Sequence, residues 1–272
     1  MSGSLVIVGT GIQLGQITLE TKAHIELAEK VLYLVADPIT ENWIKQLNSN
    51  SESLSSFYKE GQNRLITYEA MVDHILSSVR NGKKVCAVFY GHPGIFVYPS
   101  HKAINIAKNE GFEARMLPGV SAEDCLFADL NVDPGKGCQS FEATDFLIRK
   151  ATFDPSNILI LWQIGVVGEA KYNPDCNLKG IPLLTELLTK YYSKSHNVVV
   201  YEASQYVVCQ PVIQRINLGD LPKAKISGIS TLFIPPQKSR EINHEMKKQL
   251  EKCMFGEESS YRFKSLLNED SP

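Results

Sequence analysis

An arginine and a tyrosine with the spacing of one helical turn, Arg64 and Tyr68, are the residue pair best suited to chemistry. Side chains four residues apart on a helix lie on the same face, and we expect a helix to start here. Arginine is always charged, whereas a phenol with an ordinary pKa of about 10 acts as a base only where nearby positive charge lowers that value. The pair could favour a phenolate; the alternative is an exposed arginine stacked on a tyrosine.

A second candidate is the loop at the end of an apolar run, residues 85–89. This run stops at Tyr-Gly-His-Pro-Gly, residues 90–94. A continuous apolar run bounded by glycine and proline predicts a buried central strand that opens into a loop. Open α/β sheets bind their ligands at such strand ends, so we expect a ligand here.

A glycine-rich segment, residues 9–15, follows the first apolar run and reads Gly-Thr-Gly-Ile-Gln-Leu-Gly. Asp37 closes the next predicted strand, where a dinucleotide fold places a ribose-binding acid. The last glycine comes one position late for the dinucleotide motif. A tight turn between strand and helix is therefore favoured over binding of a nicotinamide cofactor.

The elements that must position these residues alternate between strands and helices. In residues 1–119 the pattern predicts a doubly wound parallel sheet. The expected strands are 5–9, 31–35, 85–89 and 114–117, and the expected helices are 19–30, 41–47, 65–80 and 100–109. The polar stretch 48–56 is expected to be a loop.

A mixed sheet is expected in the second half, because hairpin-like spacing replaces the crossovers. The expected strands are 157–162, 197–201, 207–217 and 228–235, and the expected helices are 120–130 and 183–192. The chain then divides into an amino-terminal α/β lobe (1–119), a carboxy-terminal mixed α/β lobe (120–237) and a helical tail (238–272). The apolar stripe of the tail helix either packs on its own domain or contacts a partner or a second copy.

Composition limits the classes of partner. The 272 residues are 43% hydrophobic with a net charge of −2, which gives no support for nucleic-acid binding. Six scattered cysteines, with no CxxC pair and no histidine cluster, indicate neither a metal site nor a disulfide framework. Without a signal peptide or a long apolar run, we expect a cytoplasmic protein that does not cross a membrane.

Four segments in order resemble the landmarks of the tetrapyrrole-methylase-like class of S-adenosylmethionine (SAM) methyltransferases. They are Gly-Thr-Gly-Ile at 9–12, Tyr-Gly-His-Pro-Gly-Ile-Phe at 90–96, Pro-Gly-Val-Ser-Ala at 118–122 and Ser-Thr-Leu-Phe-Ile at 230–234. Many members have Gly-Asp-Pro where this chain has His92. That histidine, with the blocks at 32–38 and 63–68, resembles the borosin branch, whose members methylate backbone amides of peptides.

The resemblance implies a two-lobed α/β fold with SAM in the cleft between a parallel and a mixed sheet. It also implies a set of cofactor-binding residues from both lobes. These are Tyr90, Gly91, His92, Ile95, Phe96, Ser121, Ala122, Gln163, Tyr201, Ala203, Ser230 and Thr231. No metal is expected.

The resemblance assigns the catalytic roles as well. Arg64 and Tyr68 match a borosin Arg-x-x-x-Tyr pair, Tyr58 matches an active-site tyrosine, and Tyr90 enters from the strand loop. We assign proton removal to Tyr68 with Tyr58, the carbonyl oxygen to Arg64, and the ordering of amide and methyl donor to Tyr90. Ser55 and Ser56 stand where the family can carry a further aromatic residue, and this departure removes an aromatic contact between the loop and a peptide.

The substrate is expected to be a separate precursor peptide. The chain ends at residues 265–272 without an apolar segment like the fused precursors of some borosins, which resembles the split arrangement that acts in trans. The family implies a homodimer, or a heterotetramer with two substrate chains. The alternatives are a small-molecule or tetrapyrrole methyltransferase and a SAM-binding scaffold without catalysis.

Overall fold

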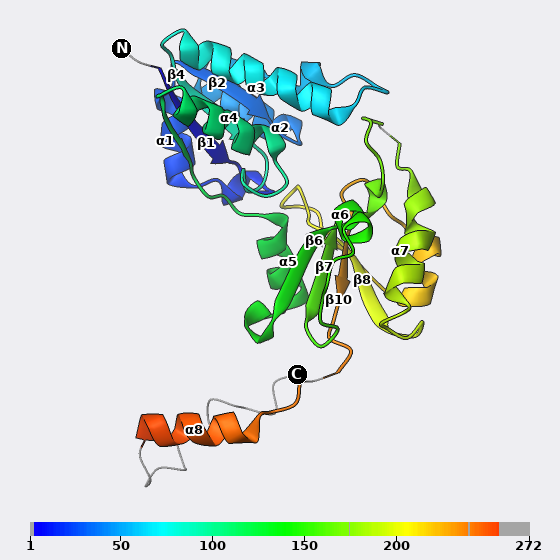
Figure 1. Cartoon of the computed structure of the whole chain (residues 1–272). Coiled ribbons are helices and arrows are strands. Elements are labelled where there is room, and N and C mark those ends of the chain that lie inside the picture. Colours follow the sequence, from blue (N-terminus) through cyan, green and yellow to red (C-terminus); the bar gives the residue numbers. More distant parts are fainter. Residues whose placement is uncertain (1–2, 174, 239, 256–272) are drawn as a thin grey trace.

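The computed structural model describes residues 3–173, 175–238 and 240–255. Two five-stranded sheets form two lobes, one above the other in Figure 1. The first sheet ends at Met116 and the second starts at Cys138. The two sheets therefore lie on either side of the predicted boundary at residues 119 and 120.

The sheet of the amino-terminal lobe is entirely parallel, with the strand order β3-β2-β4-β1-β5. Its strands are β1 (Ser4–Gly9), β2 (Lys30–Leu34), β3 (Ser51–Ser53), β4 (Lys84–Phe89) and β5 (Glu113–Met116). The central strand β4 is buried from Val85 to Phe89, because helices cover both faces of the sheet. The loop that follows its carboxyl end faces the second lobe.

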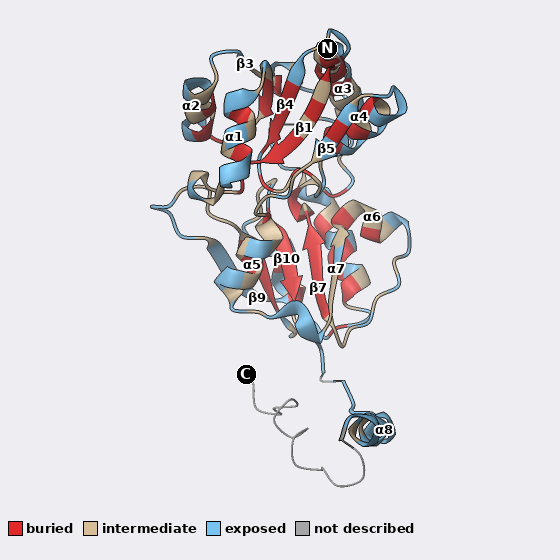
Figure 2. Cartoon of the chain, turned by 90° about the vertical axis from the view of Figure 1, so that its left-hand side faces the viewer, coloured by how far each residue is buried: buried red, intermediate tan, exposed pale blue. Residues whose placement is uncertain are grey.

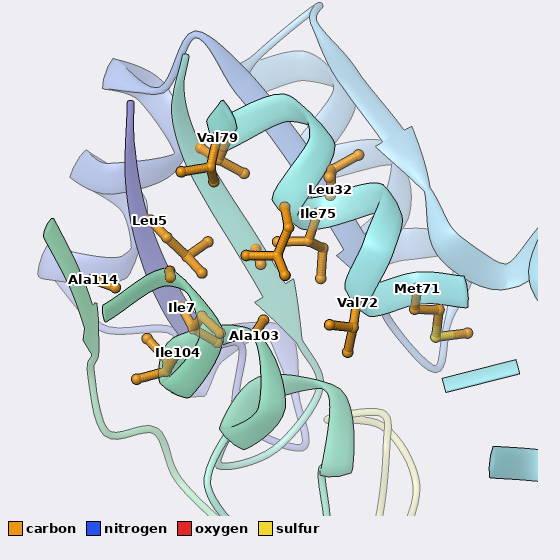
Figure 3. Packing of buried hydrophobic residues seen from close by; sticks show 14 of the residues in the cluster. Leu5, Ile7, Leu32, Met71, Val72, Ile75, Val79, Ala103, Ile104 and Ala114 are labelled. Carbon is orange, nitrogen blue, oxygen red and sulfur yellow. The ribbon is translucent and has the colours of Figure 1, made fainter. Parts of the chain in front are cut away.

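Helices α3 (Arg64–Arg80) and α4 (Tyr98–Asn109) cover one face of this sheet, and α1 (Leu19–Leu27) and α2 (Pro38–Leu47) cover the other. Figure 3 shows the first interface, where an apolar face of α3 packs on side chains of β1. The buried residues of that face recur at helical spacing: Met71, Val72, Ile75, Leu76 and Val79. This burial fixes the rotation of α3 and thus the direction of its first turn.

The sheet of the carboxy-terminal lobe is mixed, with the order β6-β7-β10-β8-β9 and only β6 and β7 parallel. Its strands are β6 (Cys138–Glu142), β7 (Ile158–Trp162), β8 (Asn197–Glu202), β9 (Val212–Asn217) and β10 (Thr231–Ile234). Helix α5 (Ala122–Leu130) packs on one face, and α6 (Ala143–Ile148) and α7 (Ile181–Leu188) pack on the other. Figure 2 shows the buried strands at the centre of each lobe.

The predicted fold class, a parallel sheet followed by a mixed sheet, is confirmed. The prediction of a loop at 48–56 is wrong in part, since it contains β3 and a 3-10 turn at Leu54–Phe57. Strand β3 reads Ser-Glu-Ser, so composition gave no strand signal, and pairing with β2 decides its conformation. Strand β6 and helix α6 were also not predicted, because β6 is short and only partly buried.

Helix α8 (His244–Phe255) lies apart from both lobes in Figures 1 and 2. Its side chains Met246, Leu250 and Met254 are 50%, 47% and 68% exposed. Of the two interpretations of this stripe, the structure therefore does not show packing on its own domain, and contact with a partner or a second copy stays a prediction. Residues 265–272, on which the expectation of a separate substrate depends, lie outside the described residues. None of the helices described is long and apolar enough to cross a bilayer.

Candidate active site

A cavity of about 350 Å³ lies between the two lobes, at the carboxyl ends of strands from both sheets. The loop after β4 contributes Tyr90 and His92, and the end of β7 contributes Trp162 and Gln163. Ser121 lines it from the start of α5. Its volume falls in the range of small-molecule sites, roughly 300 to 1,000 Å³.

Ten of the twelve predicted cofactor-binding residues line this cavity. They are Tyr90, Gly91, His92, Ile95, Phe96, Ser121, Ala122, Gln163, Ala203 and Thr231. The structure therefore brings together residues that lie as far as 141 positions apart in the chain.

Tyr201 and Ser230 are not among the lining residues, although both were predicted as cofactor contacts. Tyr201 is fully buried on β8, and its hydroxyl donates to a carboxylate oxygen of Asp129 at 2.7 Å. Ser230 is also fully buried, accepts from the Ser227 N–H at 2.8 Å and donates to Glu202. Both hydroxyls are directed to protein partners, so we interpret these residues as supports of the cavity wall.

The glycine-rich segment forms part of the cavity's base. The Gly91 N–H donates to the Gly11 carbonyl at 2.8 Å, which joins the end of β1 to the loop after β4. At Gly9 a Cβ atom would stand only 2.2 Å from the Gly91 carbonyl oxygen. Glycine is required there because two backbones touch, not because a phosphate approaches a helix. Residues 14–16 form a 3-10 turn, and α1 starts only at Leu19.

Asp37 has a structural role that differs from the ribose contact considered above. Its carboxylate accepts from the N–H groups of Ile39 at 3.0 Å and Thr40 at 2.9 Å, which makes it the N-cap of α2. Asp37 does not line the cavity. The arrangement therefore favours the tight turn over a dinucleotide site.

His92 shapes the loop after β4. Its Nδ1 accepts from the Gly94 N–H at 2.9 Å, so the proton of the neutral ring is on Nε2. An aspartate at this position could accept from the same N–H, which explains how histidine can replace the residue of the wider class.

Two cavity residues, Phe96 and Gln163, have left-handed backbone conformations with φ of 55° and 59°. Such conformations are costly for residues other than glycine and concentrate at functional sites. The ring of Phe96 contacts Trp162, with 6.0 Å between centroids. The sequence did not indicate Trp162 as a cavity residue, because a tryptophan at the end of an apolar strand is typical of the core.

A second cavity of about 440 Å³ adjoins the first and shares five lining residues with it: Arg64, Phe96, Val97, Gln163 and Val166. Its remaining lining residues are Tyr68, Tyr98, His101, Glu142, Thr144 and Glu169. The sequence gave no signal for these six apart from Tyr68, because they come from five different segments. Arg64 thus stands where the two cavities meet, and Tyr68 lines the second cavity only.

Four tyrosines form a row beside this junction. Tyr58 contacts Tyr172 with 4.8 Å between ring centroids and Tyr68 edge-on with 6.4 Å. Tyr68 in turn stacks on Tyr98 at 6.2 Å. The predicted catalytic residues Tyr58 and Tyr68 are therefore neighbours, and Tyr172 and Tyr98 extend the row at its two ends.

The tyrosines and Arg64 influence one another electrostatically. Burial raises the pKa of Tyr58 above its ordinary value, and Tyr68 and Tyr90 raise it further, whereas Arg64 lowers it. Tyr90 is partly exposed in the cavity, but the protein around it still raises its pKa by desolvation, and Arg64 again opposes that effect. On both of these phenols burial outweighs the effect of Arg64, so both stay protonated at neutral pH. The predicted activation of Tyr68 by Arg64 stays a prediction.

The guanidinium of Arg64 is held but not neutralised. Its Nε donates to the Lys171 carbonyl oxygen at 3.3 Å. Among the described residues, no carboxylate forms an ion pair with it. The remaining N–H groups can therefore bind an oxygen on a ligand.

The first cavity has the chemical character that a cationic, adenine-containing cofactor requires. The rings of Tyr90, Phe96 and Trp162 offer faces for stacking and for cation–π contact. The carboxylates of Glu123 and Asp175 add negative charge to the wall. In the part of the chain that the structure describes, no group of His, Cys, Asp and Glu side chains could hold a metal.

Comparison with known proteins places the chain in a family. The profile of the tetrapyrrole (corrin/porphyrin) methylases matches residues 4–206. The chain is 45% identical over 256 residues to the methyltransferase and cyclic peptide dendrothelin A precursor of Dendrothele bispora, covering 92% of this chain and 61% of the relative. The omphalotin A precursor of Omphalotus olearius, also named a methyltransferase, is 44% identical, with 94% and 63% covered.

Other comparisons agree on family and fold. A type III borosin precursor methyltransferase of Anomoporia bombycina is 43% identical, with 89% of this chain but only 29% of the relative covered. The chain thus spans about three fifths or less of the length of these three relatives. Uroporphyrin-III C-methyltransferase from Thermus thermophilus has the same fold, with a TM-score of 0.61 at 16% identity over 87% of this chain and 93% of that one.

The profile match covers most of the chain, and relatives named as borosin precursors bear out the resemblance of the motifs. The chain therefore belongs to the tetrapyrrole (corrin/porphyrin) methylase family, and its predicted similarity to the borosin methyltransferases is confirmed.

Proposed function

We propose that the protein is a SAM-dependent α-N-methyltransferase that methylates backbone amides of a precursor peptide. The observation that carries this proposal is the junction of two cavities at Arg64, an unpaired cation next to three phenols. The first cavity has the character of a cofactor site, and the second cavity, called the groove below, is the proposed site of the peptide. The names of the relatives, which join a methyltransferase to a cyclic peptide precursor, support a peptide as the substrate.

The chemistry explains why a cation and phenols are needed together. The nitrogen lone pair of an amide is delocalised into the carbonyl group, so the neutral amide is a poor nucleophile. Bound SAM supplies an electrophilic methyl group on a sulfonium. The protein must remove the amide proton and stabilise the negative charge that then develops on the carbonyl oxygen.

We assign these tasks to residues at the junction. Tyr68 takes the amide proton, and Arg64 donates to the carbonyl oxygen with the N–H groups that Lys171 does not use. Tyr90, which lines the cofactor cavity, orders the amide and the methyl donor. Tyr58 keeps its own proton, since burial raises its pKa, and supports Tyr68 by the edge-on contact of their rings. This changes the proposed role of Tyr58 from a base to a supporting residue.

The peptide and the oligomer belong to the same proposal. We propose that the peptide reaches the groove as a separate chain, and the experiment below decides between that and a fused segment like those of the relatives. We also propose a homodimer, since the exposed apolar stripe of α8 offers a surface for a second copy or for the precursor. Two bound precursors would then give a heterotetramer.

The test is intact-mass analysis after incubation of the protein and a candidate precursor peptide with SAM. We expect mass steps of one methyl group on the peptide with the wild type, and none with Arg64→Ala. Steps on the enzyme chain itself would show a fused substrate and contradict action in trans. Turnover of a precorrin-type substrate, or SAM binding without any methylated product, would contradict the proposed function.

A further inference from the structure

Two short segments from different lobes pair with each other next to Arg64. We call them the strap: residues 61–64, just before and at the start of α3, and residues 170–172, in the loop before α7. The Tyr172 N–H donates to the Gln62 carbonyl at 2.8 Å, and the Arg64 N–H donates to the Ala170 carbonyl at 3.0 Å. The Gly61 N–H donates back to the Tyr172 carbonyl at 2.9 Å. Figure 1 shows the loop before α7 reaching up towards the first lobe.

Each side of the strap is anchored in its own lobe. The Gln62 side chain donates to the hydroxyl of the fully buried Thr67 at 2.8 Å. In the other lobe, the chain turns at Gly168, which has a φ of 76°, and its N–H donates to Thr144 at 3.0 Å. Because the anchors are separate, the strap transmits the position of one lobe to the other.

The strap holds residues to which the proposed function gives catalytic roles. The Arg64 backbone is a member of the pairing, and its Nε binds the Lys171 carbonyl at 3.3 Å. The ring of Tyr172 packs on Tyr58 with 4.8 Å between centroids. Both contacts come from the second lobe and act on residues of the first.

We propose that the strap places Arg64 at the cofactor cavity and Tyr58 against Tyr68, and that Tyr172 is a positioning residue for methyl transfer. Tyr172 lines neither cavity, so it acts through Tyr58 and through its backbone bonds. The proposal deepens the proposed function and rests on it. The proposal requires a closed strap during turnover, that is, a strap whose backbone hydrogen bonds between residues 61–64 and 170–172 stay formed.

The first test replaces the ring. Tyr172→Ala should lower kcat by about tenfold or more, the scale expected when a catalytic group is displaced slightly, with SAM affinity, peptide KM and Tm unchanged. Tyr172→Phe keeps the ring and should restore kcat to within about twofold of the wild type. Tyr191→Ala is the matched control, because that tyrosine packs on Phe153 away from both cavities. An unchanged kcat, or a loss explained by SAM affinity or Tm, would overturn the proposal.

The second test locks the strap. Asn63 and Lys171 face each other as an antiparallel pair whose hydrogen bonds are made by their neighbours. In such pairs the Cα atoms are about 4.5 Å apart, within reach of a disulfide. The Asn63→Cys/Lys171→Cys variant should oxidise readily and keep its kcat within about threefold of its reduced form. Loss of turnover on oxidation and recovery on reduction would overturn the requirement for a closed strap.

The two tests separate failure of this inference from failure of the proposed function. Formation of the disulfide reports strap pairing without any methylation assay. A wild-type protein that methylates no peptide would contradict the proposed function while the disulfide still forms. Active wild type without disulfide formation in the double variant would contradict the strap alone.

Discussion

Arg64 has the central position among the individual residues, because it lines both cavities and carries a charge that no described carboxylate neutralises. Arg64→Ala should reduce methyl transfer by at least about 10²-fold, the scale of losing one transition-state stabiliser, and leave SAM binding intact. The assay is the initial rate of methylated peptide formation with SAM affinity measured in parallel. Arg80→Ala, on the same helix but paired with Glu110, is the control and should keep the wild-type rate. Near-wild-type turnover of Arg64→Ala would contradict its assignment.

Tyr68 is the residue assigned to remove the amide proton. Tyr68→Phe removes the hydroxyl and keeps the ring that stacks on Tyr98. We expect at least about a 10²-fold loss of rate with an unchanged Tm, since only the proton acceptor is lost. Tyr98→Phe is the comparison, because its hydroxyl is bound to Glu69 and is not assigned to the reaction. A near-wild-type rate for Tyr68→Phe would show that this ring acts only through packing, and an equal loss in Tyr98→Phe would contradict the special role assigned to Tyr68.

The pH dependence of the rate tests whether a phenol accepts the amide proton. Burial holds the pKa of Tyr58 and Tyr90 above the ordinary value, so both keep their protons at neutral pH and leave proton removal to Tyr68. A phenol accepts a proton only as the phenolate, so the rate of the chemical step should rise with pH between pH 7 and 9. A plateau below pH 9 in single-turnover rates would contradict a phenol as the base.

Individual elements position the site through their ends. Asp37 caps α2 by accepting two backbone N–H groups. Asp37→Ala should lower the free energy of unfolding by about 1 kcal/mol, whereas Asp37→Asn should retain most of it. SAM affinity should stay unchanged in both, measured by calorimetry alongside denaturant unfolding. Weaker cofactor binding without loss of stability would instead support a ligand contact at Asp37.

On strand β8, the buried Tyr201 tests whether its hydroxyl supports the fold or binds the cofactor. Tyr201→Phe removes a hydrogen bond to Asp129, whose carboxylate is exposed and can bind water instead. We expect a loss of about 1 kcal/mol in the free energy of unfolding and no change in SAM affinity. Thr231→Ala, at a cavity-lining position on the neighbouring strand, is the comparison and should weaken SAM binding. A weaker SAM affinity in Tyr201→Phe would restore the role first predicted for Tyr201.

Sequence patterns predicted the elements that bury apolar faces and missed those that are defined by pairing. The strand before Tyr90 was predictable because burial on both faces of a sheet leaves a continuous apolar run. The helix carrying Arg64 was predictable because its buried residues recur at helical spacing. Strand β3 was not, since three polar residues form a strand only through their partner β2. The roles of Tyr172 and Trp162 depend on contacts between the lobes, and no local pattern encodes such contacts.

The whole molecule consists of two lobes with the site between them and a helix, α8, that lies apart. Replacing Met246, Leu250 and Met254 by serine should leave Tm and SAM affinity unchanged, because these exposed side chains support neither lobe. If the stripe joins two copies, as proposed, light scattering should show a dimer for the wild type and a monomer for the triple variant. A lower Tm for the variant would indicate that the stripe packs on its own lobe in solution.

The central claim is that the methyl group is transferred to a backbone nitrogen. It is tested most directly by fragmentation mass spectrometry of a precursor peptide after reaction with the protein and SAM. The account predicts methyl groups on backbone amides, present with the wild type and absent with Arg64→Ala. Methylation confined to side chains, or equal products from both proteins, would contradict it.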